Sequence, residues 1–287
     1  MGGRLKIEFV VAWVMLACGG STDETPTEHA PQGWHPVGTP IELGTEIAEI
    51  QIANDSRESL WSVHAGAWTV LQKSKCWELV RSNCRVRACR SPADPDSPSI
   101  EPRQIGHLTV DVGAQTVVIP AGGAGPNGPM PLWEGSTQIQ VISEGANVPA
   151  FNIVLNGPDR VETTLPQFPP FGGYLELAWD DPVGLAWENG RAGQVVHGVL
   201  GWETWQDKLR YSTTIDCEFD AASGGGEIPA EAMREVPRES ALASTILVVF
   251  TQETVTTQAG DYLVTATATN PARSTQGEIS AAWLTPK

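Results

Sequence analysis

The sequence is poor in the residues and spacings from which enzyme and metal sites are usually built. Its five histidines never lie four residues apart and its cysteines form no Cys-x-x-Cys pair, so the ligand spacings typical of zinc sites are absent. No Gly-x-Ser-x-Gly segment is present, although that segment marks a large class of serine hydrolases. These absences predict a protein that is not an enzyme and that holds neither a metal nor a cofactor.

Acidic residues offer a second set of candidates for such chemistry. Asp94 and Asp96 could bind calcium, but the glycine and the distal glutamate of an EF-hand loop are missing. Carboxylate pairs of the kind that a glycosidase needs occur at Asp180 and Asp181 and at Asp216, Glu218 and Asp220. The last three alternate along one predicted strand, as residues on a solvent-facing side do. We therefore interpret them as a surface face and not as a catalytic site.

Basic residues are scarce. The 18 lysines and arginines stand against 34 acidic residues, which gives a net charge of −16 and disfavours nucleic acid as a partner. Residues 73–90 are the exception, since they hold Lys73, Lys75, Arg81, Arg85, Arg87 and Arg90 but only one acid, Glu78. Arg85 and Arg87 are therefore candidate contacts for an anionic envelope polysaccharide; the alternative is a solvated hairpin whose cations pair with acidic neighbours.

Long apolar runs are missing except at the N-terminus. Arg4 and Lys6 precede an apolar run at residues 9–17, which is too short to span a bilayer of about 30 Å and is typical of a signal peptide. The run ends in Met-Leu-Ala-Cys-Gly at residues 15–19, which resembles the lipobox of bacterial lipoproteins. In those proteins the cysteine, here Cys18, carries a lipid anchor.

Several expectations follow from this resemblance. Residues 1–17 would be removed, together with two cations and one anion, which takes the net charge to −17. Gly19 is not the aspartate that is associated with inner-membrane retention, so we expect a membrane anchor in the cell envelope, on the outer membrane. Residues 18–43 are then the lipidated cysteine and a tether, because the segment is mostly Ser, Thr, Glu, Pro and Gly and has too few apolar residues to fold.

Beyond the tether the hydrophobic pattern has the period of β-strands. Residues 211–219 alternate apolar and polar side chains, as do residues 108–112 and 175–179. Further strands are predicted at residues 46–53, 60–71, 116–119, 137–142, 151–156, 193–200, 245–252, 261–269 and 278–283, with one short helix at residues 228–234. About a dozen short strands between Gly- and Pro-rich turns predict an all-β fold of antiparallel, Ig-like sandwiches. A Pro-rich stretch at residues 165–171 suggests domains at 44–163 and 164–287, or one domain that joins both.

Four cysteines remain after Cys18, an even number in an oxidising compartment, which favours two disulfides among Cys76, Cys84, Cys89 and Cys217. Alternation places Cys84 with Val86 and Cys217 with Ile215, whereas Cys89 shares its face with Arg85 and Arg87. If both strands line one core, this parity allows Cys84–Cys217 with Cys76–Cys89. Alternatively, a local loop closes on Cys76 and leaves Cys217 as a buried thiol. We expect at least one bond within residues 76–89.

Tryptophan is unusually frequent, with ten residues after Cys18. Trp202 and Trp205 lie near a predicted turn, and an exposed indole can stack on a sugar ring. These two residues are therefore candidate carbohydrate contacts; the alternative is that the indoles fill the sandwich cores.

The order of segments resembles that of uncharacterised bacterial surface lipoproteins with β-sandwich domains. It comprises the lipobox, the tether, a Cys-rich hairpin at residues 84–89 and a Gly-rich strand pair at 106–120. Motifs at residues 131–135, 148–151 and 215–230 follow. The resemblance implies location and fold but no reaction. The expected function is a non-enzymatic interaction or structural role, with an envelope polysaccharide or surface protein as partner; the alternatives are a carbohydrate-binding module and a hydrolase with a site assembled from distant strands.

Overall fold

The computed structural model describes residues 35–36, 46–55, 60–70, 75–92, 100–121, 127–129, 131–170, 173–178, 181–206, 209–235, 244–275 and 280–286. They form 21 strands, a 3₁₀ turn η1 (Ala221–Ser223) and one short helix α2 (Ala230–Met233). The all-β, sandwich-like prediction is confirmed. Within these ranges no helix has the length and apolar character that crossing a membrane requires.

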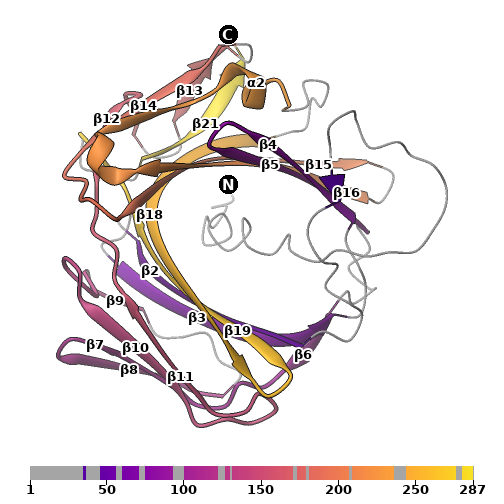
Figure 1. The fold of residues 1–287 in the computed structure, drawn as a ribbon, viewed down its shortest axis with the longest axis vertical. Helices are drawn as coiled ribbons and strands as arrows, with labels where there is room; N and C mark the ends of the chain where they lie inside the picture. The colour runs from indigo at the N-terminus through magenta and orange to yellow at the C-terminus, as the bar shows by residue number, and fades with distance from the viewer. Residues whose placement is uncertain are drawn as a thin grey trace, which may run out of the picture.

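Thirteen strands form one large sheet that bends strongly along its length (Figure 1). Its order is β1 (His35–Pro36), β4 (Lys75–Arg81), β5 (Cys84–Pro92), β16 (Leu209–Asp220), β15 (Val195–Gln206), β18 (Ser244–Ala259), β19 (Tyr262–Pro271), β2 (Glu46–Asp55), β3 (Leu60–Val70) and β6 (Ile100–Arg103). Three more strands branch off, because β21 (Ala281–Pro286) pairs with β18, β13 (Tyr174–Leu177) with β21, and β9 (Asn127–Pro129) with β3. Most pairs are antiparallel as expected, whereas β19–β2 and β13–β21 are parallel.

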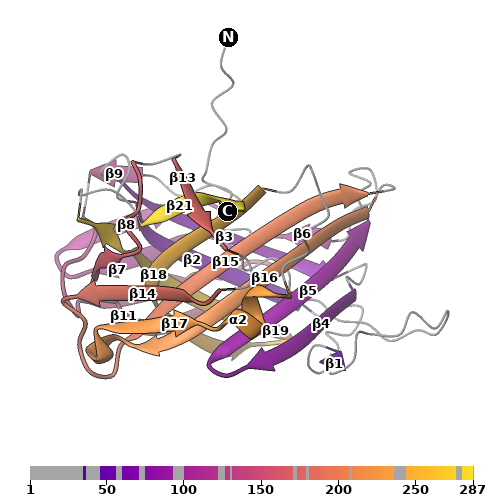
Figure 2. The same cartoon turned by 90° about the horizontal axis from the view of Figure 1, so that it is seen from above.

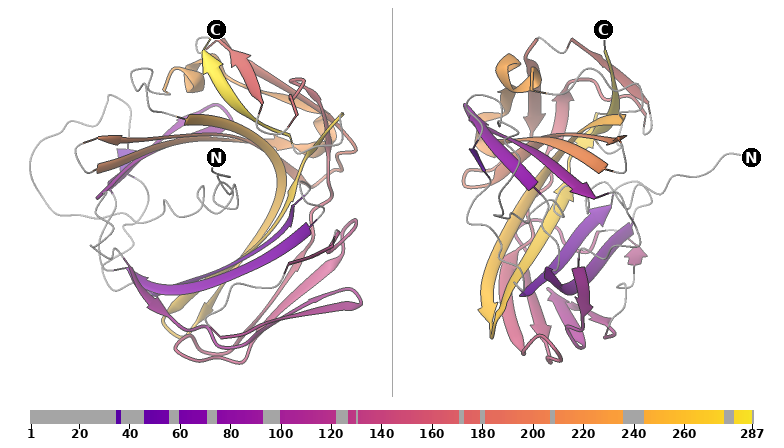
Figure 3. Two further views of the ribbon diagram at one scale, coloured as in Figure 1. Left: turned by 180° about the vertical axis from the view of Figure 1, so that it is seen from behind. Right: turned by 90° about the vertical axis from the view of Figure 1, so that its right-hand side faces the viewer.

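Two small sheets cover the convex face of the large sheet. The first consists of β11 (Phe151–Asn156), β10 (Gln138–Ser143), β7 (Leu108–Val112) and β8 (Gln115–Ile119). The second consists of β17 (Gly225–Ile228), β14 (Val183–Glu188), β12 (Glu162–Leu165) and β20 (Arg273–Ser274). Figure 2 shows β14 and β17 lying over β16, and the view from behind in Figure 3 places the first small sheet outside β2 and β3.

Each small sheet encloses its own core against the large sheet. The first core includes Ile50 and Ile52 of β2 and Val110 of β7, and the second includes Ile215 of β16 and Trp187 of β14. One strand serves both cores, since Leu247 and Val249 of β18 lie in the second and its Ala259 lies in the first. These three residues have odd numbers and therefore point to one side of the strand, which puts both cores on the same face of the large sheet.

The crossing between the two small sheets is held to the large sheet by polar contacts. Asn270 donates to the Pro158 carbonyl at 2.9 Å, and the Thr251 hydroxyl donates to the Asp159 carbonyl at 2.7 Å. The Trp133 indole N–H donates to the same Pro158 carbonyl at 3.1 Å. Buried polar groups are costly when they are unpaired, so these bonds specify where the chain leaves the first core and enters the second.

Both disulfides join directly opposite residues of neighbouring strands. Cys76 of β4 bonds Cys89 of β5, and Cys84 of β5 bonds Cys217 of β16. This is the pairing that strand parity allows, so that alternative is confirmed, and the one with Cys217 as a buried thiol is wrong. Cys84 and Cys217 lie in the second core, while Cys76 and Cys89 belong to the concave face by alternation.

The predicted strands are largely present, with shifted ends. The segment predicted at residues 245–252 extends to Ala259 in β18, because it stays paired with β19 from Phe250 to Ala259. The short strands β12, β14 and β17 were not predicted. Strands on both sides of residue 164 pair in the large sheet, as β5 does with β16 and β2 with β19. The two halves are therefore not separated at that point.

Candidate functional site

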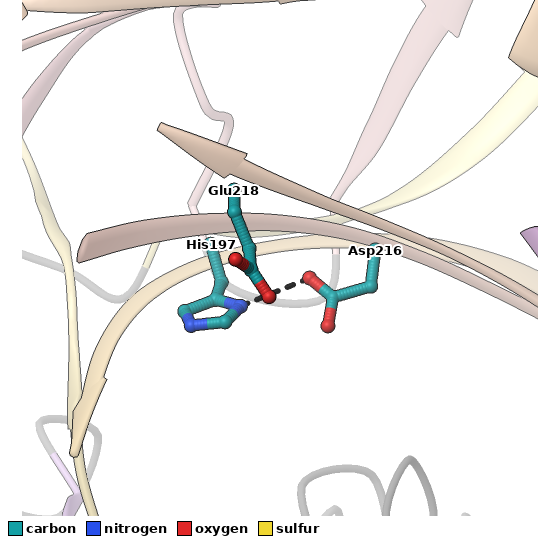
Figure 4. Close-up of side chains that lie close together, drawn as sticks. All are labelled: His197, Asp216 and Glu218. Carbon is teal, nitrogen blue, oxygen red and sulfur yellow. Dashed lines mark hydrogen bonds and ion pairs between the residues drawn. The ribbon is translucent and has the colours of Figure 1, made fainter. Parts of the chain in front are cut away.

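The concave face of the large sheet carries a cluster of three titratable side chains. His197 lies on β15, and Asp216 and Glu218 lie on the neighbouring β16. His197 stands directly opposite Glu218 in the strand register, and Asp216 follows two residues away on the same side. Figure 4 shows all three side chains projecting together from these strands. Val196 and Leu200 of β15 enter the second core instead.

His197 is held in place from two sides. Its Nδ1 lies 2.9 Å from Oδ1 of Asp216, and its ring stacks on Phe250 of β18 with 5.2 Å between ring centres and 5° between planes. The residue is only 8% exposed, while Asp216 is half-buried and Glu218 is exposed. A buried imidazole with two neighbouring carboxylates offers a set of ligands that could hold a metal cation.

A charged group lies beside this cluster on the same face. Arg85 of β5 is opposite Asp216 in register, yet its nearest ion-pair partner is Glu78 of β4 at 3.9 Å. Arg87 pairs with the same Glu78 at 3.2 Å. The two arginines therefore share the carboxylate of Glu78, while Asp216 bonds His197.

The concave face is polar and mostly uncharged at residues 252–258 of β18 and at the threonines of β19 beside them, whereas Ile246, Val248 and Phe250 of β18 form an apolar patch on the same face. Thr254 and Thr267 place their hydroxyl oxygens 3.2 Å apart, as do Thr256 and Thr265. Glu49 of β2 lies beside Thr265 in register. Burial raises the pKa of Glu49 to about 7, because desolvation disfavours its charged form.

The predicted ligand residues have different surroundings from those expected. Trp202 is 7% exposed and lies in the second core, so the idea that it offers an exposed ring is wrong. Trp205 belongs to β15, but its side chain lies outside the described residues. Arg85 and Arg87 pair with Glu78, which agrees with the solvated, acid-paired hairpin that was the alternative. The side chain of Arg85 is 60% exposed and that of Arg87 is 22% exposed.

Several other predictions fall on residues that the structure does not describe. They include the signal peptide, the anchor at Cys18, most of the tether and the acidic loop with Asp94 and Asp96. Asp180 is also outside the described ranges, and Asp181 is exposed. Asp216, Glu218 and Asp220 share one face of β16 as alternation predicted.

Sequence reasoning missed His197 as a member of a cluster. His197 lies in a predicted strand, and alternation with Val196 would have placed its side chain on the side away from the core. Its partners are 19 and 21 positions away on another strand, so no spacing rule for metal ligands could have found them.

No protein-family model matches this chain, and no curated protein matches it in sequence.

Proposed function

We propose that the protein is a lipid-anchored protein of the bacterial cell envelope, on the outer membrane, with a non-enzymatic interaction role. We propose further that its ligand binds to the concave face of the large sheet. The anchor rests on the sequence up to Cys18, where a short apolar run ends in a lipobox-like motif and a polar tether follows.

The contrast between the two faces of the large sheet supports the binding role. The convex face is closed by two small sheets and lined by apolar side chains. The concave face, among the described residues, is packed against no second sheet and carries threonines, Gln51, charged groups and an apolar patch around Phe250. A concave surface with a few convergent polar groups is the usual form of a binding site.

The chemistry of this face favours a neutral, hydroxyl-rich ligand over an anionic one. The threonine pairs and Gln51 offer hydroxyl and amide groups, and Arg85 and Arg87, which lie further along the same face on β5, are paired with Glu78. An envelope glycan without charge fits these groups. The carbohydrate-binding alternative through Trp202 loses its support, since that ring is buried.

The anchor is tested by the intact mass of the protein extracted from membranes. A chain that begins at Cys18 with added lipid mass is the expected result. A chain that retains Met1 and carries no lipid would overturn the proposed location.

The binding face is tested by photo-crosslinking in intact cells. A crosslinking amino acid placed at Thr256, which is exposed on the concave face, should give adducts with envelope material. The matched control is Val118 of β8, which is 56% exposed on the outer side of the first small sheet. Adducts from Val118 and none from Thr256 would contradict the proposal.

A further inference from the structure

We infer that His197, Asp216 and Glu218 form a binding site for a divalent transition-metal ion of the zinc class. The inference goes beyond the proposed role and depends neither on the lipid anchor nor on a glycan ligand. It rests on the side-chain geometry of β15 and β16.

The three side chains already bring their ligand atoms together. One nitrogen of His197 and one carboxylate oxygen from each of Asp216 and Glu218 lie within 4.8 Å of one another. Zinc bonds to nitrogen and oxygen are about 2.0–2.2 Å long, so two ligand atoms of a tetrahedral ion lie roughly 3.5 Å apart. Glu218 is exposed, so its side chain has room to turn toward such an ion. Figure 4 shows the Nδ1 side of the ring turned toward both carboxylates.

His197 lies beside an aromatic ring and near a group of apolar side chains. The His197 ring lies parallel to that of Phe250, and an apolar patch of Val199, Ile246, Val248, Phe250 and Ala281 lies on the same face of the sheet. Hydrophobic groups around a metal limit access of water and strengthen its bonds to charged ligands. Asn83 holds the backbone of Glu218 on β16. Its carbonyl accepts from the Glu218 N–H at 3.1 Å, and its side-chain amide donates to the Glu218 carbonyl at 3.0 Å.

The charge balance also favours a divalent ion. The carboxylates of Asp216 and Glu218 lie close together here and face the same imidazole. A divalent cation offsets both carboxylates at once.

The donor set distinguishes between metals. Calcium and magnesium prefer oxygen ligands alone, whereas an imidazole nitrogen is a preferred ligand of zinc, copper and nickel. Three protein ligands leave at least one coordination position for water or for another ligand. The class of ion is therefore a transition metal.

The experiment is titration calorimetry of the chelator-treated full chain with Zn²⁺, compared with His197→Gln and Glu218→Gln. The wild type should bind one ion, and each substitution should weaken binding by about 100-fold or more, because loss of an orienting residue alone costs about 10- to 100-fold. Glu218→Gln changes an exposed side chain and leaves the core intact. His64→Gln is the matched control, since His64 is an exposed histidine on the same concave face.

Three outcomes would overturn the inference. They are the absence of stoichiometric Zn²⁺ binding, binding that persists in both cluster variants, and displacement of Zn²⁺ by an equal concentration of Ca²⁺. Binding that is lost in both cluster variants and kept in His64→Gln supports it. Replacement of Zn²⁺ by Co²⁺ adds a spectroscopic check, because the visible spectrum of cobalt should change in the wild type and not in His197→Gln.

Discussion

The two faces of the large sheet are made by the same strands and have opposite characters. On β16, Ile215, Cys217 and Phe219 enter the second core, while the residues between them, Asp216 and Glu218, lie on the concave face. On β2 the same alternation separates Ile50 from Glu49. The two large cores therefore lie on the convex side, while the concave side combines polar and charged groups with the smaller apolar patch around Phe250. One strand can therefore contribute to a core on one side and to a polar surface on the other when a second sheet covers only one side.

The largest expected effect concerns the disulfides, one on each face. Cys84–Cys217 spans 133 residues and Cys76–Cys89 spans 13. In the chain-entropy description, a longer loop constrains the unfolded chain more, so removal costs about 5 kcal/mol for the first and about 3 kcal/mol for the second. Denaturant unfolding of two variants, in which both cysteines of one disulfide are replaced by alanine, measures the two losses in the free energy of unfolding. Equal losses would mean that loop length does not decide the contributions.

The next effect separates neighbouring residues on opposite faces. Ile215→Ala leaves a cavity in the second core, where Ile215 is fully buried, and should lower the free energy of unfolding by about 3–4 kcal/mol. Thr214→Ala, one residue earlier and on the concave side, should change it by about 0.5 kcal/mol or less. Urea unfolding of both variants tests this contrast, which fails if the two losses are similar.

A smaller effect should come from Glu49 and depend on pH. Its folded-state pKa is about 7, above the ordinary value of 4.5. The folded chain thus holds a proton that the unfolded chain has released, and stability falls as pH rises from about 4.5 to about 7. With allowance for the partial exposure of Glu49, the free energy of unfolding falls by about 2 kcal/mol over this pH range.

Glu49→Gln should remove this dependence. The variant should be more stable than the wild type at pH 8 and equal to it at pH 4.5, as measured by thermal unfolding across that range. Gln51→Glu, at a neighbouring concave position, controls for the effect of placing a carboxylate on this face. Parallel stability curves for wild type and Glu49→Gln would contradict the assignment.

The smallest effect is expected at the paired arginines. Glu78→Gln removes the partner of Arg85 and Arg87, but ion pairs near a surface contribute about 1 kcal/mol or less. The loss should shrink further as salt is added, because ions screen exposed charges. A salt-independent loss of several kcal/mol would show that this group is a buried network.

Much of the architecture was readable from particular residues. The alternation at residues 211–219 identified β16 and its two faces, and the parity of Cys84 and Cys217 allowed the disulfide that is present. The short strands β12, β14 and β17 were missed; β12 and β17 have only four residues each, and a glycine and an alanine interrupt the larger side chains of β14. The buried position of Trp202 was not readable either, since its surroundings come from the second small sheet.

The sequence by itself determined the all-β class, the period of the strands and the face on which each side chain of β16 lies. These properties are local, because successive side chains of a strand point to opposite sides whatever the strand pairs with. Only the tertiary structure decided which strands are neighbours, and so brought His197 of β15 beside Asp216 and Glu218 of β16. The register between β15 and β16 depends on packing in the second core, and residues about 20 positions apart carry no local signal of it.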